Sequence, residues 1–457
     1  MKVAVAGAGI LGLTLAHRLA HLGHEVEVFE AGPELGGLAC TQDYGLFHWD
    51  RYYHCILPQD SALIDLLGEL GLGGELRWTR TGTGYYGKKR FHDMNGNADF
   101  LRFPLLSVVD KARLAATVIY ATRFADPWQL YRVSAEEWLT KLCGRRGYEI
   151  FWQPLLKAKF GSFYDRVAAV FIWATLKRLT GARSAATSRE KLGYVAGGGY
   201  KRILERFSER LSARGAVIRL SSPVVRLGRS DESHCDLAWK DGGGEHSARF
   251  DQVYFTGPTR LARKAAGPEL HRYIDGVAAD HPTSEAYLGV CCMVLASKRP
   301  LTPYYVLNIG DPTIELTGVI EMTNLVDRHA ETAGLSLIYL PRYMDSADPR
   351  FDEPDDALRA SLMDRGIKRL FPDLRDDELM YSKIHRARYV QPLPLVRAGG
   401  AGVTEVPTLV RPFQVLNTSM LTCATLNNNE VVALVDRFVD KNRAALGTTP
   451  STTAAAS

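Results

Sequence analysis

The sequence predicts an α/β protein in which a discontinuous, doubly wound domain of the Rossmann type is joined to an α+β domain. Three observations predict it. The first 30 residues are patterned as strand, helix and strand, with glycines in the first turn. Residues 104–190 are patterned mostly as helices, and residues 283–345 carry four β-patterned runs, which predict a helical subdomain and an antiparallel sheet. No repeat or linker divides the chain, so both domains are expected to be built from separated pieces.

The N-terminal βαβ unit carries a glycine fingerprint at its first turn. The apolar strand Lys2–Ala6 runs directly into Gly7-Ala8-Gly9-Ile10-Leu11-Gly12 and then into a helix. Gly7 allows a tight turn, Gly9 lets the backbone approach a pyrophosphate, and Gly12 lets the helix lie close to the strand. The helix N-terminus offers N–H groups and the positive end of its dipole to phosphates. Glycines alone would be weak evidence, but the agreement of strand, glycines and helix predicts a dinucleotide site.

An acidic residue and a second glycine pair indicate which dinucleotide binds. Glu30 ends the second strand, 18 residues after Gly12, where its carboxylate can accept hydrogen bonds from ribose hydroxyls. Gly36-Gly37 follow six residues later. This pattern resembles the FAD-binding N-terminus of the flavin amine oxidase, protoporphyrinogen oxidase and phytoene desaturase superfamily, and more distantly that of UDP-galactopyranose mutase. The resemblance implies FAD as the cofactor. Relatives usually have arginine after the glycine pair, where this chain has Leu38.

Later segments extend the resemblance. Gly198-Gly199-Tyr200 and the following helix resemble the return of the chain to the FAD-binding domain, and in relatives the backbone at the Val224 position meets the adenine. The superfamily usually has a Gly-Asp pair before its last helix, whereas this chain has Asn417-Thr418-Ser419. The fingerprint and the resemblance together imply that the following residues bind the cofactor: Gly7, Ala8, Gly9, Ile10, Leu11, Gly12, Glu30, Ala31, Gly36, Gly37, Leu38, Val224, Gly257, Asn417, Asn428 and Glu430.

The domain boundaries follow from the same pattern. Residues 1–78, 191–258 and 410–446 are expected to form the Rossmann-like FAD-binding domain. Residues 79–190 are expected to form the helical part of the substrate domain, and residues 259–409 its sheet part. Small polar residues at 447–457 predict a disordered tail.

Four residues are candidates for catalysis. His54 closes the sequence Asp50-Arg51-Tyr52-Tyr53-His54, which resembles a loop beside the flavin in a bacterial branch of the superfamily. An imidazole there can accept a proton or stabilise reduced flavin, although a histidine hydrogen-bonded within its loop is the alternative. Lys159 lies among apolar residues, where a lysine needs a partner or a cavity. Arg388 and Tyr389 lie in an extended segment that passes close to the flavin in relatives, with a structural role as the alternative.

Composition excludes several other functions. The net charge of +5 is spread over 457 residues, without basic runs that interleave with aromatics, so nucleic acid is not an expected partner. Seven widely spaced cysteines without a CxxC motif indicate reduced thiols and no metal site, and with the absence of a signal peptide they predict a cytoplasmic protein. The aromatic residues between 151 and 173 are expected to be core. The alternatives are a wall of a substrate cavity and a membrane-dipping surface, and the second would place the protein peripherally at the inner face of a membrane.

The resemblance therefore implies an FAD-dependent oxidoreductase that oxidises or desaturates a small organic substrate by hydride transfer to the flavin. The alternative is a non-redox, flavin-dependent sugar-nucleotide mutase of the UDP-galactopyranose mutase type, whose C-terminal arginine and tyrosine pattern is not recognisable here. A flavoprotein without catalysis is a third hypothesis, based only on Leu38 and the missing Gly-Asp pair.

Overall fold

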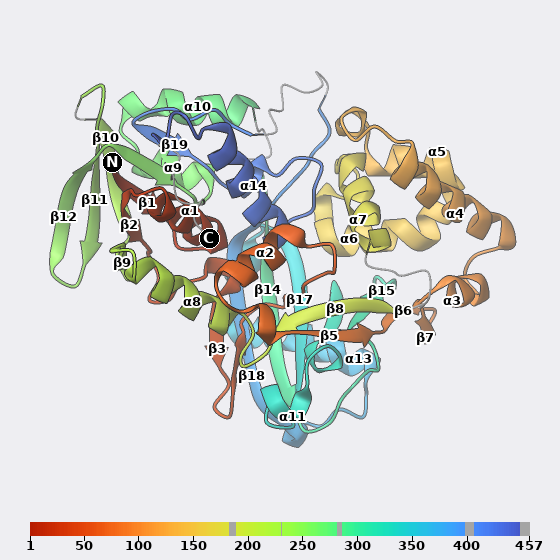
Figure 1. Cartoon of the computed structure of the whole chain (residues 1–457). Helices are drawn as coiled ribbons and strands as arrows, with labels where there is room; N and C mark the ends of the chain where they lie inside the picture. Colours follow the sequence, from red (N-terminus) through yellow and green to blue (C-terminus); the bar gives the residue numbers. More distant parts are fainter. Residues whose placement is uncertain (182–188, 230, 281–285, 398–405, 448–457) are drawn as a thin grey trace, which may run out of the picture.

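The computed structural model describes residues 1–181, 189–229, 231–280, 286–397 and 406–447. It has a parallel-sheet part at the left of Figure 1, a helical part at the right and a large sheet below them. This arrangement confirms the predicted fold class, whereas the exact domain boundaries stay a prediction. The tail expected at 447–457 lies outside the described residues apart from Gly447.

Five parallel strands form the doubly wound sheet, in the order β19-β13-β1-β2-β9. They are β1 (Lys2–Ala6), β2 (Glu25–Phe29), β9 (Val217–Arg219), β13 (Gln252–Phe255) and β19 (Phe413–Val415). Because these strands come from three distant stretches of the chain, the domain is discontinuous as predicted. The associated helices are α1 (Ile10–His21), α2 (Ser61–Glu69), α8 (Tyr200–Ser212) and α14 (Asn428–Lys441).

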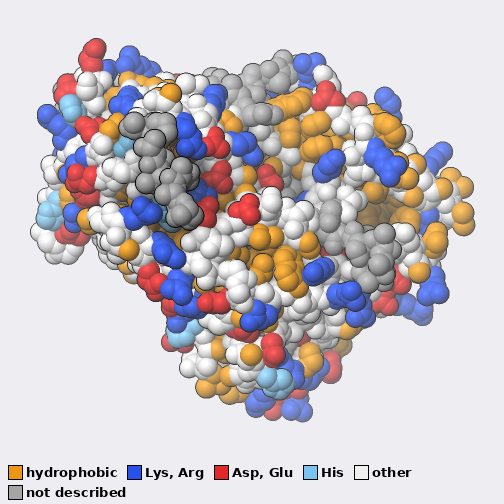
Figure 2. Space-filling view, in the orientation of Figure 1, with side chains coloured by type: hydrophobic (Ala, Val, Ile, Leu, Met, Phe, Trp, Pro, Cys, Tyr) orange, Lys and Arg blue, Asp and Glu red, His pale blue; other side chains and the backbone are white. Residues whose placement is uncertain are grey.

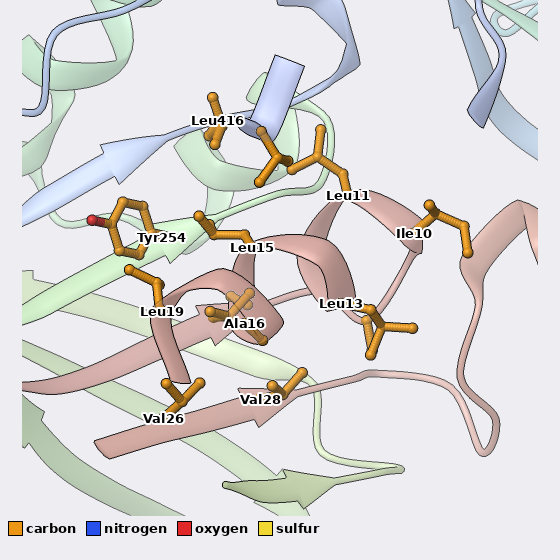
Figure 3. Packing of buried hydrophobic residues seen from close by; sticks show 14 of the residues in the cluster. Ile10, Leu11, Leu13, Leu15, Ala16, Leu19, Val26, Val28, Tyr254 and Leu416 are labelled. Carbon is orange, nitrogen blue, oxygen red and sulfur yellow. The ribbon is translucent and has the colours of Figure 1, made fainter. Parts of the chain in front are cut away.

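The core of this part forms around α1. Leu11, Leu15 and Leu19 recur on one face of the helix, as an amphipathic pattern requires, and lie beside Tyr254 and Leu416 of the sheet (Figure 3). All five side chains are buried. This packing holds the N-terminus of α1 in place at the carboxyl end of β1.

Smaller antiparallel elements attach to this core. The strands β10 (Val224–Arg229), β11 (Cys235–Asp241) and β12 (Gly244–Phe250) form a three-stranded sheet whose β11–β12 hairpin turns where the sequence predicts. β3 (Thr41–Asp43) pairs with β4 (His48–Asp50). The remaining short helices are α9 (Thr259–Ala265), α10 (His271–Asp280) and α11 (Arg328–Glu331).

A seven-stranded sheet lies below, in the order β18-β14-β17-β16-β15-β6-β7. Its strands are β6 (Thr83–Gly87), β7 (Arg90–Asp93), β14 (Tyr287–Ser297), β15 (Val306–Ile309), β16 (Gly318–Glu321), β17 (Ser336–Asp345) and β18 (Leu379–Pro392). The expectation of a purely antiparallel sheet is corrected, because β15 pairs with β6 in parallel. On one side of the sheet, α12 (Asp355–Leu362) and α13 (Lys368–Leu370) help to cover the apolar side chains.

One long-range strand pairing was not anticipated. β6 and β7 pair with each other as a local hairpin. β5 (Leu76–Thr81) pairs instead with β8 (Glu190–Val195), more than a hundred residues further on. This ribbon connects the two places where the chain leaves and re-enters the parallel-sheet part.

The helical part contains α3 (Asn97–Arg102), α4 (Val108–Arg123), α5 (Ala135–Gly147), α6 (Gln153–Phe160) and α7 (Ala169–Gly181), with a π-helical turn at Tyr148–Trp152. Trp152, Phe160 and Phe171 are buried in its core. The aromatic stretch is therefore core, and the alternative of a membrane-dipping surface at this stretch is wrong. Among the described helices, none combines the length and apolar character needed to cross a bilayer.

A glycine substitution tests the packing of α1. A Cβ on Gly12 would lie 1.9 Å from the carbonyl oxygen of Gly7, so Gly12→Ala must separate the helix from the strand and is expected to cost about 1–3 kcal/mol of unfolding free energy. Gly68→Ala is the control, since its Cβ would meet nothing within 4 Å and alanine is the better helix former. Thermal unfolding measures both. Equal melting temperatures for the two variants would contradict this account.

Candidate functional site

The turn between β1 and α1 has the geometry of a phosphate cradle. Gly7 has φ +114°, and a Cβ there would lie 2.5 Å from Thr256 Oγ1. A Cβ on Gly9 would meet only the carbonyl oxygen of Gly36, at 3.9 Å, so this side of the turn is open. α1 starts at Ile10 without a side-chain cap, and its first N–H groups have no intrahelical acceptors. These groups, including those of Ile10, Leu11 and Gly12, can therefore donate to a pyrophosphate.

Glu30 closes this turn. Its Oε2 accepts the N–H of Ala8 at 2.8 Å, and its Oε1 accepts the N–H of Gly32 at 2.8 Å. Its backbone carbonyl accepts the N–H of Ser222 at 2.7 Å. The carboxylate thus lies at the end of β2 beside the turn, where the sequence predicts a ribose contact. Exposed Ala31 lies next to it along the chain.

Val224 lies close in sequence to Ser222, which hydrogen-bonds Glu30. It begins β10, two residues after Ser222 and its hydrogen bond to Glu30. Its side chain is half-buried against the core of the parallel-sheet part. The structure therefore places Val224 where the resemblance implies an adenine contact, and the contact itself stays a prediction.

The second glycine pair adjoins the first turn. The N–H of Gly36 donates to the carbonyl of Ala8 at 2.8 Å, and Gly36 and Gly9 form a parallel bridge. Gly36 and Gly37 have φ +109° and +57°, which favour glycine. Leu38 follows in a 3₁₀ turn and is half-buried. The structure thus brings both glycine motifs together, as the resemblance implies.

The C-terminal residues that are predicted to bind the cofactor make two kinds of contact. Asn417 is almost fully buried and binds protein: its Nδ2 donates to the carbonyl of Gly257 at 2.9 Å, and its Oδ1 accepts from Ser419. It therefore ties the loop after β19 to the loop after β13. Asn428 and Glu430 lie in the first turn of α14, where Asn428 hydrogen-bonds Tyr200 and Glu430 accepts from Asn429 at 3.3 Å.

His54 belongs to a charged pair. Its Nδ1 lies 3.4 Å from Asp50 Oδ2, close enough for an ion pair when the imidazole is protonated. Asp50 is 2% exposed and accepts the N–H of Tyr200 at 2.9 Å. Burial raises the pKa of the Asp50 carboxyl, and the neighbouring His54 partly offsets this. Arg51, next to Asp50 in the chain, pairs instead with Glu34, at 3.3 Å.

Lys159 lies between aromatic rings. Its Nζ is 4.7 Å from the ring centroid of Tyr343 and 5.8 Å from that of Phe171. Within the described part of the chain it has no hydrogen bond or ion pair. Burial lowers its pKa to about 8. Tyr343 also exchanges a 3.0 Å hydrogen bond with Tyr53, from the loop that contains His54.

Arg388 and Tyr389 lie at the end of β18. The Arg388 guanidinium donates to the carbonyl of Ser346, pairs with Asp352 and stacks on Phe351, contacts that favour the structural alternative. The Tyr389 ring packs against Tyr287. Neither contact set brings these two residues to Lys159 or His54.

A cavity lies between the helical part and the last loop of the parallel-sheet part. Phe171 and Tyr131 line it on the helical side, Gln391 lines it from β18, and residues between 418 and 426 line it on the other side. Sequence reasoning missed Tyr131 and Tyr343, whereas Phe171 belongs to the aromatic stretch for which a cavity wall was one alternative. Tyr343 lies in a strand, where side chains alternate between the two faces of the sheet. This alternation predicts the face that Tyr343 occupies, but not the residues that it contacts.

Replacing Glu30 tests the cradle. Glu30→Gln retains the size of the side chain but turns an acceptor into a donor that faces one of two backbone N–H groups, so the affinity for FAD is expected to fall about tenfold. Glu34→Gln removes an exposed acid four residues away and is expected to bind FAD as the parent does. Quenching of FAD fluorescence during reconstitution measures both affinities. A Glu30→Gln protein that binds FAD as tightly as Glu34→Gln would contradict the prediction.

Curated proteins match parts of the chain. A 15-cis-phytoene desaturase from Synechococcus elongatus is 26% identical over 255 residues, which cover 51% of this chain and 52% of that protein. A flavin-dependent L-tryptophan oxidase from Lentzea aerocolonigenes is 38% identical over 84 residues, 18% of each chain. The chain therefore spans about half or less of the length of these two relatives.

Solved structures share the fold over nearly the whole chain. A putative protoporphyrinogen oxidase from Exiguobacterium sp. 255-15 is 17% identical with a TM-score of 0.69, covering 96% of this chain and 98% of that one. Cyclohexylamine oxidase from Brevibacterium oxydans is 18% identical with a TM-score of 0.68, covering 97% and 98%. Reduced UDP-galactopyranose mutase is 15% identical with a TM-score of 0.63, covering 86% and 83%.

A model of the family described as flavin containing amine oxidoreductase matches residues 11–412, which is most of the chain. This match agrees with the open cradle at Gly9, with the acid at Glu30 and with the adjoining Gly36-Gly37 pair. The cofactor is FAD. The protein belongs to the family of flavin containing amine oxidoreductases.

Proposed function

We propose that the protein oxidises or desaturates a small organic substrate by hydride transfer to FAD. The observation that carries this proposal is the position of the cavity. It is bounded on one side by Phe171 of the helical part and on the other by Thr418 and Ser419, in the loop that precedes α14. The cavity has a volume of about 30 Å³ and marks the junction of the helical part with the cofactor-binding domain, where we place the substrate.

FAD, when bound, supplies the hydride acceptor. The residues of this chain orient the substrate and handle the proton. His54 is the proposed proton acceptor, because Asp50, buried and hydrogen-bonded to the N–H of Tyr200, stabilises the protonated imidazole. The proposal also puts three further residues near the substrate: Lys159, Arg388 and Tyr389. The contacts of Lys159 support it, whereas those of Arg388 favour a structural role.

The competing proposal is a mutase without net redox change. Its support is a shared fold with UDP-galactopyranose mutase, and a similarity of 15% identity carries no information about activity. The two proposals differ in one observable: net reduction of the flavin by substrate.

Anaerobic reduction tests the oxidoreductase proposal. Stoichiometric loss of the visible absorbance of oxidised flavin on adding candidate substrates is the expected result. Conversion that requires pre-reduced flavin, without net bleaching, would support the mutase instead. His54→Gln is expected to slow flavin reduction about 100-fold without loss of FAD, because a general base is removed. His48→Gln is the control, since His48 is exposed; equal reduction rates for the two variants would exclude His54 as the base.

We also propose that the protein contacts membranes peripherally, through α4. Val108, Val109, Ile119 and Phe124 are 81%, 59%, 51% and 72% exposed, and Figure 2 shows apolar and basic side chains gathered over the helical part. Asp110, the one acid of α4, is buried and caps its N-terminus. An apolar face with basic neighbours is complementary to an anionic bilayer.

Vesicle flotation tests this contact. The protein is expected to float with vesicles that contain phosphatidylglycerol, and Val109→Glu with Phe124→Glu is expected to abolish flotation, because two charges would enter the apolar face. Leu46→Glu is the control, since Leu46 is equally exposed but lies in the loop between β3 and β4. A parent protein that stays in the bottom fraction and does not float with the vesicles would contradict the proposal.

A further inference from the structure

Tyr200, the first residue of α8, contacts three groups of the candidate site. Its backbone N–H donates to Asp50 Oδ1 at 2.9 Å, and the centroid of its buried ring lies 4.7 Å from that of the His54 ring. Its hydroxyl hydrogen-bonds the side chain of Asn428, in the first turn of α14. One residue therefore connects the pair of His54 and Asp50 with the N-terminus of α14.

The glycines that precede Tyr200 fix the position of its backbone. Gly199 has φ +62°, and a Cβ on it would lie 2.9 Å from Asp50 Oδ1, so a larger residue would displace this carboxylate. The N–H of Gly198 donates to the carboxylate of Glu331 at 3.1 Å. Asp50 and Glu331 thus hold the segment from two elements, and the Tyr200 ring extends from a fixed point.

The imidazole of His54 depends on this ring for its orientation. Its Nδ1 lies 3.4 Å from Asp50 Oδ2, which is long for a charge-assisted hydrogen bond. This contact alone leaves the imidazole room to rotate. The Tyr200 ring packs against the imidazole at an interplanar angle of 47° and restricts that rotation. A proton acceptor must present one nitrogen to the substrate while the other keeps its N–H, so its orientation matters for the reaction.

We propose that Tyr200 is a positioning residue that orients His54 as the proton acceptor, and that the hydrogen bond between its hydroxyl and Asn428 holds it in this role. The inference rests on the proposed oxidoreductase function and adds a residue to it. Tyr200 acts through His54 and does not exchange the proton itself, since burial raises the pKa of its hydroxyl far above the usual value. Because Asn428 is also a predicted cofactor contact, the orientation of His54 is tied to the part of α14 that is expected to meet FAD.

A double-mutant cycle in flavin reduction tests the proposal. Tyr200→Phe keeps the ring but removes the hydroxyl, and it is expected to slow flavin reduction about tenfold while the half-saturating substrate concentration stays the same. In a His54→Gln background the same change is expected to have no further effect, because the residue that Tyr200 orients is gone. Tyr304→Phe is the matched control, since it removes a hydroxyl that donates to Asp93 in the large sheet.

A spectroscopic measurement tests the proposal without turnover. In protein that contains ¹⁵N-labelled histidine, at alkaline pH, the ring signals of His54 report which nitrogen carries the proton, and their loss in His54→Gln assigns them. The parent is expected to carry the N–H on Nδ1, which faces Asp50. Tyr200→Phe is expected to give signals averaged between the two tautomers, whereas Tyr304→Phe gives the spectrum of the parent.

Three results would overturn the inference: Tyr200→Phe reducing flavin at the parent's rate, an equal slowing in the His54→Gln background, or an N–H on Nε2 in the parent. If Tyr200→Phe does not fold, the spectrum of the parent still decides. A protein whose flavin no substrate reduces would contradict the proposed function instead, and the spectra would still test the role of Tyr200.

Discussion

The rest of the structure depends on the close approach of α1 to the end of β1. Gly12 lies so near the carbonyl of Gly7 that a Cβ between them would be only 1.9 Å from that oxygen. This approach brings the first N–H groups of α1 to the open side of Gly9, and it places Gly36 beside the same turn. Glu30 then closes the cradle through two backbone hydrogen bonds. A methyl group added at Gly12 would disturb all of these contacts.

Charged side chains distinguish the part of the site that lies away from the phosphate cradle. Asp50 is buried but paired with His54 and hydrogen-bonded to Tyr200, so its charge is partly compensated within the protein. Lys159 and Arg397 lie against aromatic rings without such compensation from the described residues. A buried charge with a partner costs less free energy than one without.

Local signals made the cofactor site predictable. The fingerprint from Gly7 to Gly12 and the acid at Glu30 lie within one βαβ unit, so spacing alone places them together. The pairing of β5 with β8 could not be predicted, because strand pairing over such a separation depends on tertiary packing. The role of Asn417 was not foreseen for the same reason: its partner Gly257 is distant in sequence. Lys159 was singled out as a lysine among apolar residues, and it is half-buried, but its neighbours Tyr343 and Phe171 come from two other elements.

The central claim is that the turn between β1 and α1, with Glu30 and Gly36 beside it, holds FAD. A crystal structure of the FAD complex tests it most directly. The account predicts electron density for the pyrophosphate against Gly9, for the ribose beside Glu30, and for the flavin ring next to the cavity that Phe171 and Tyr131 line. Density that places the flavin ring far from this cavity, or a dinucleotide bound away from Gly9, would contradict the account.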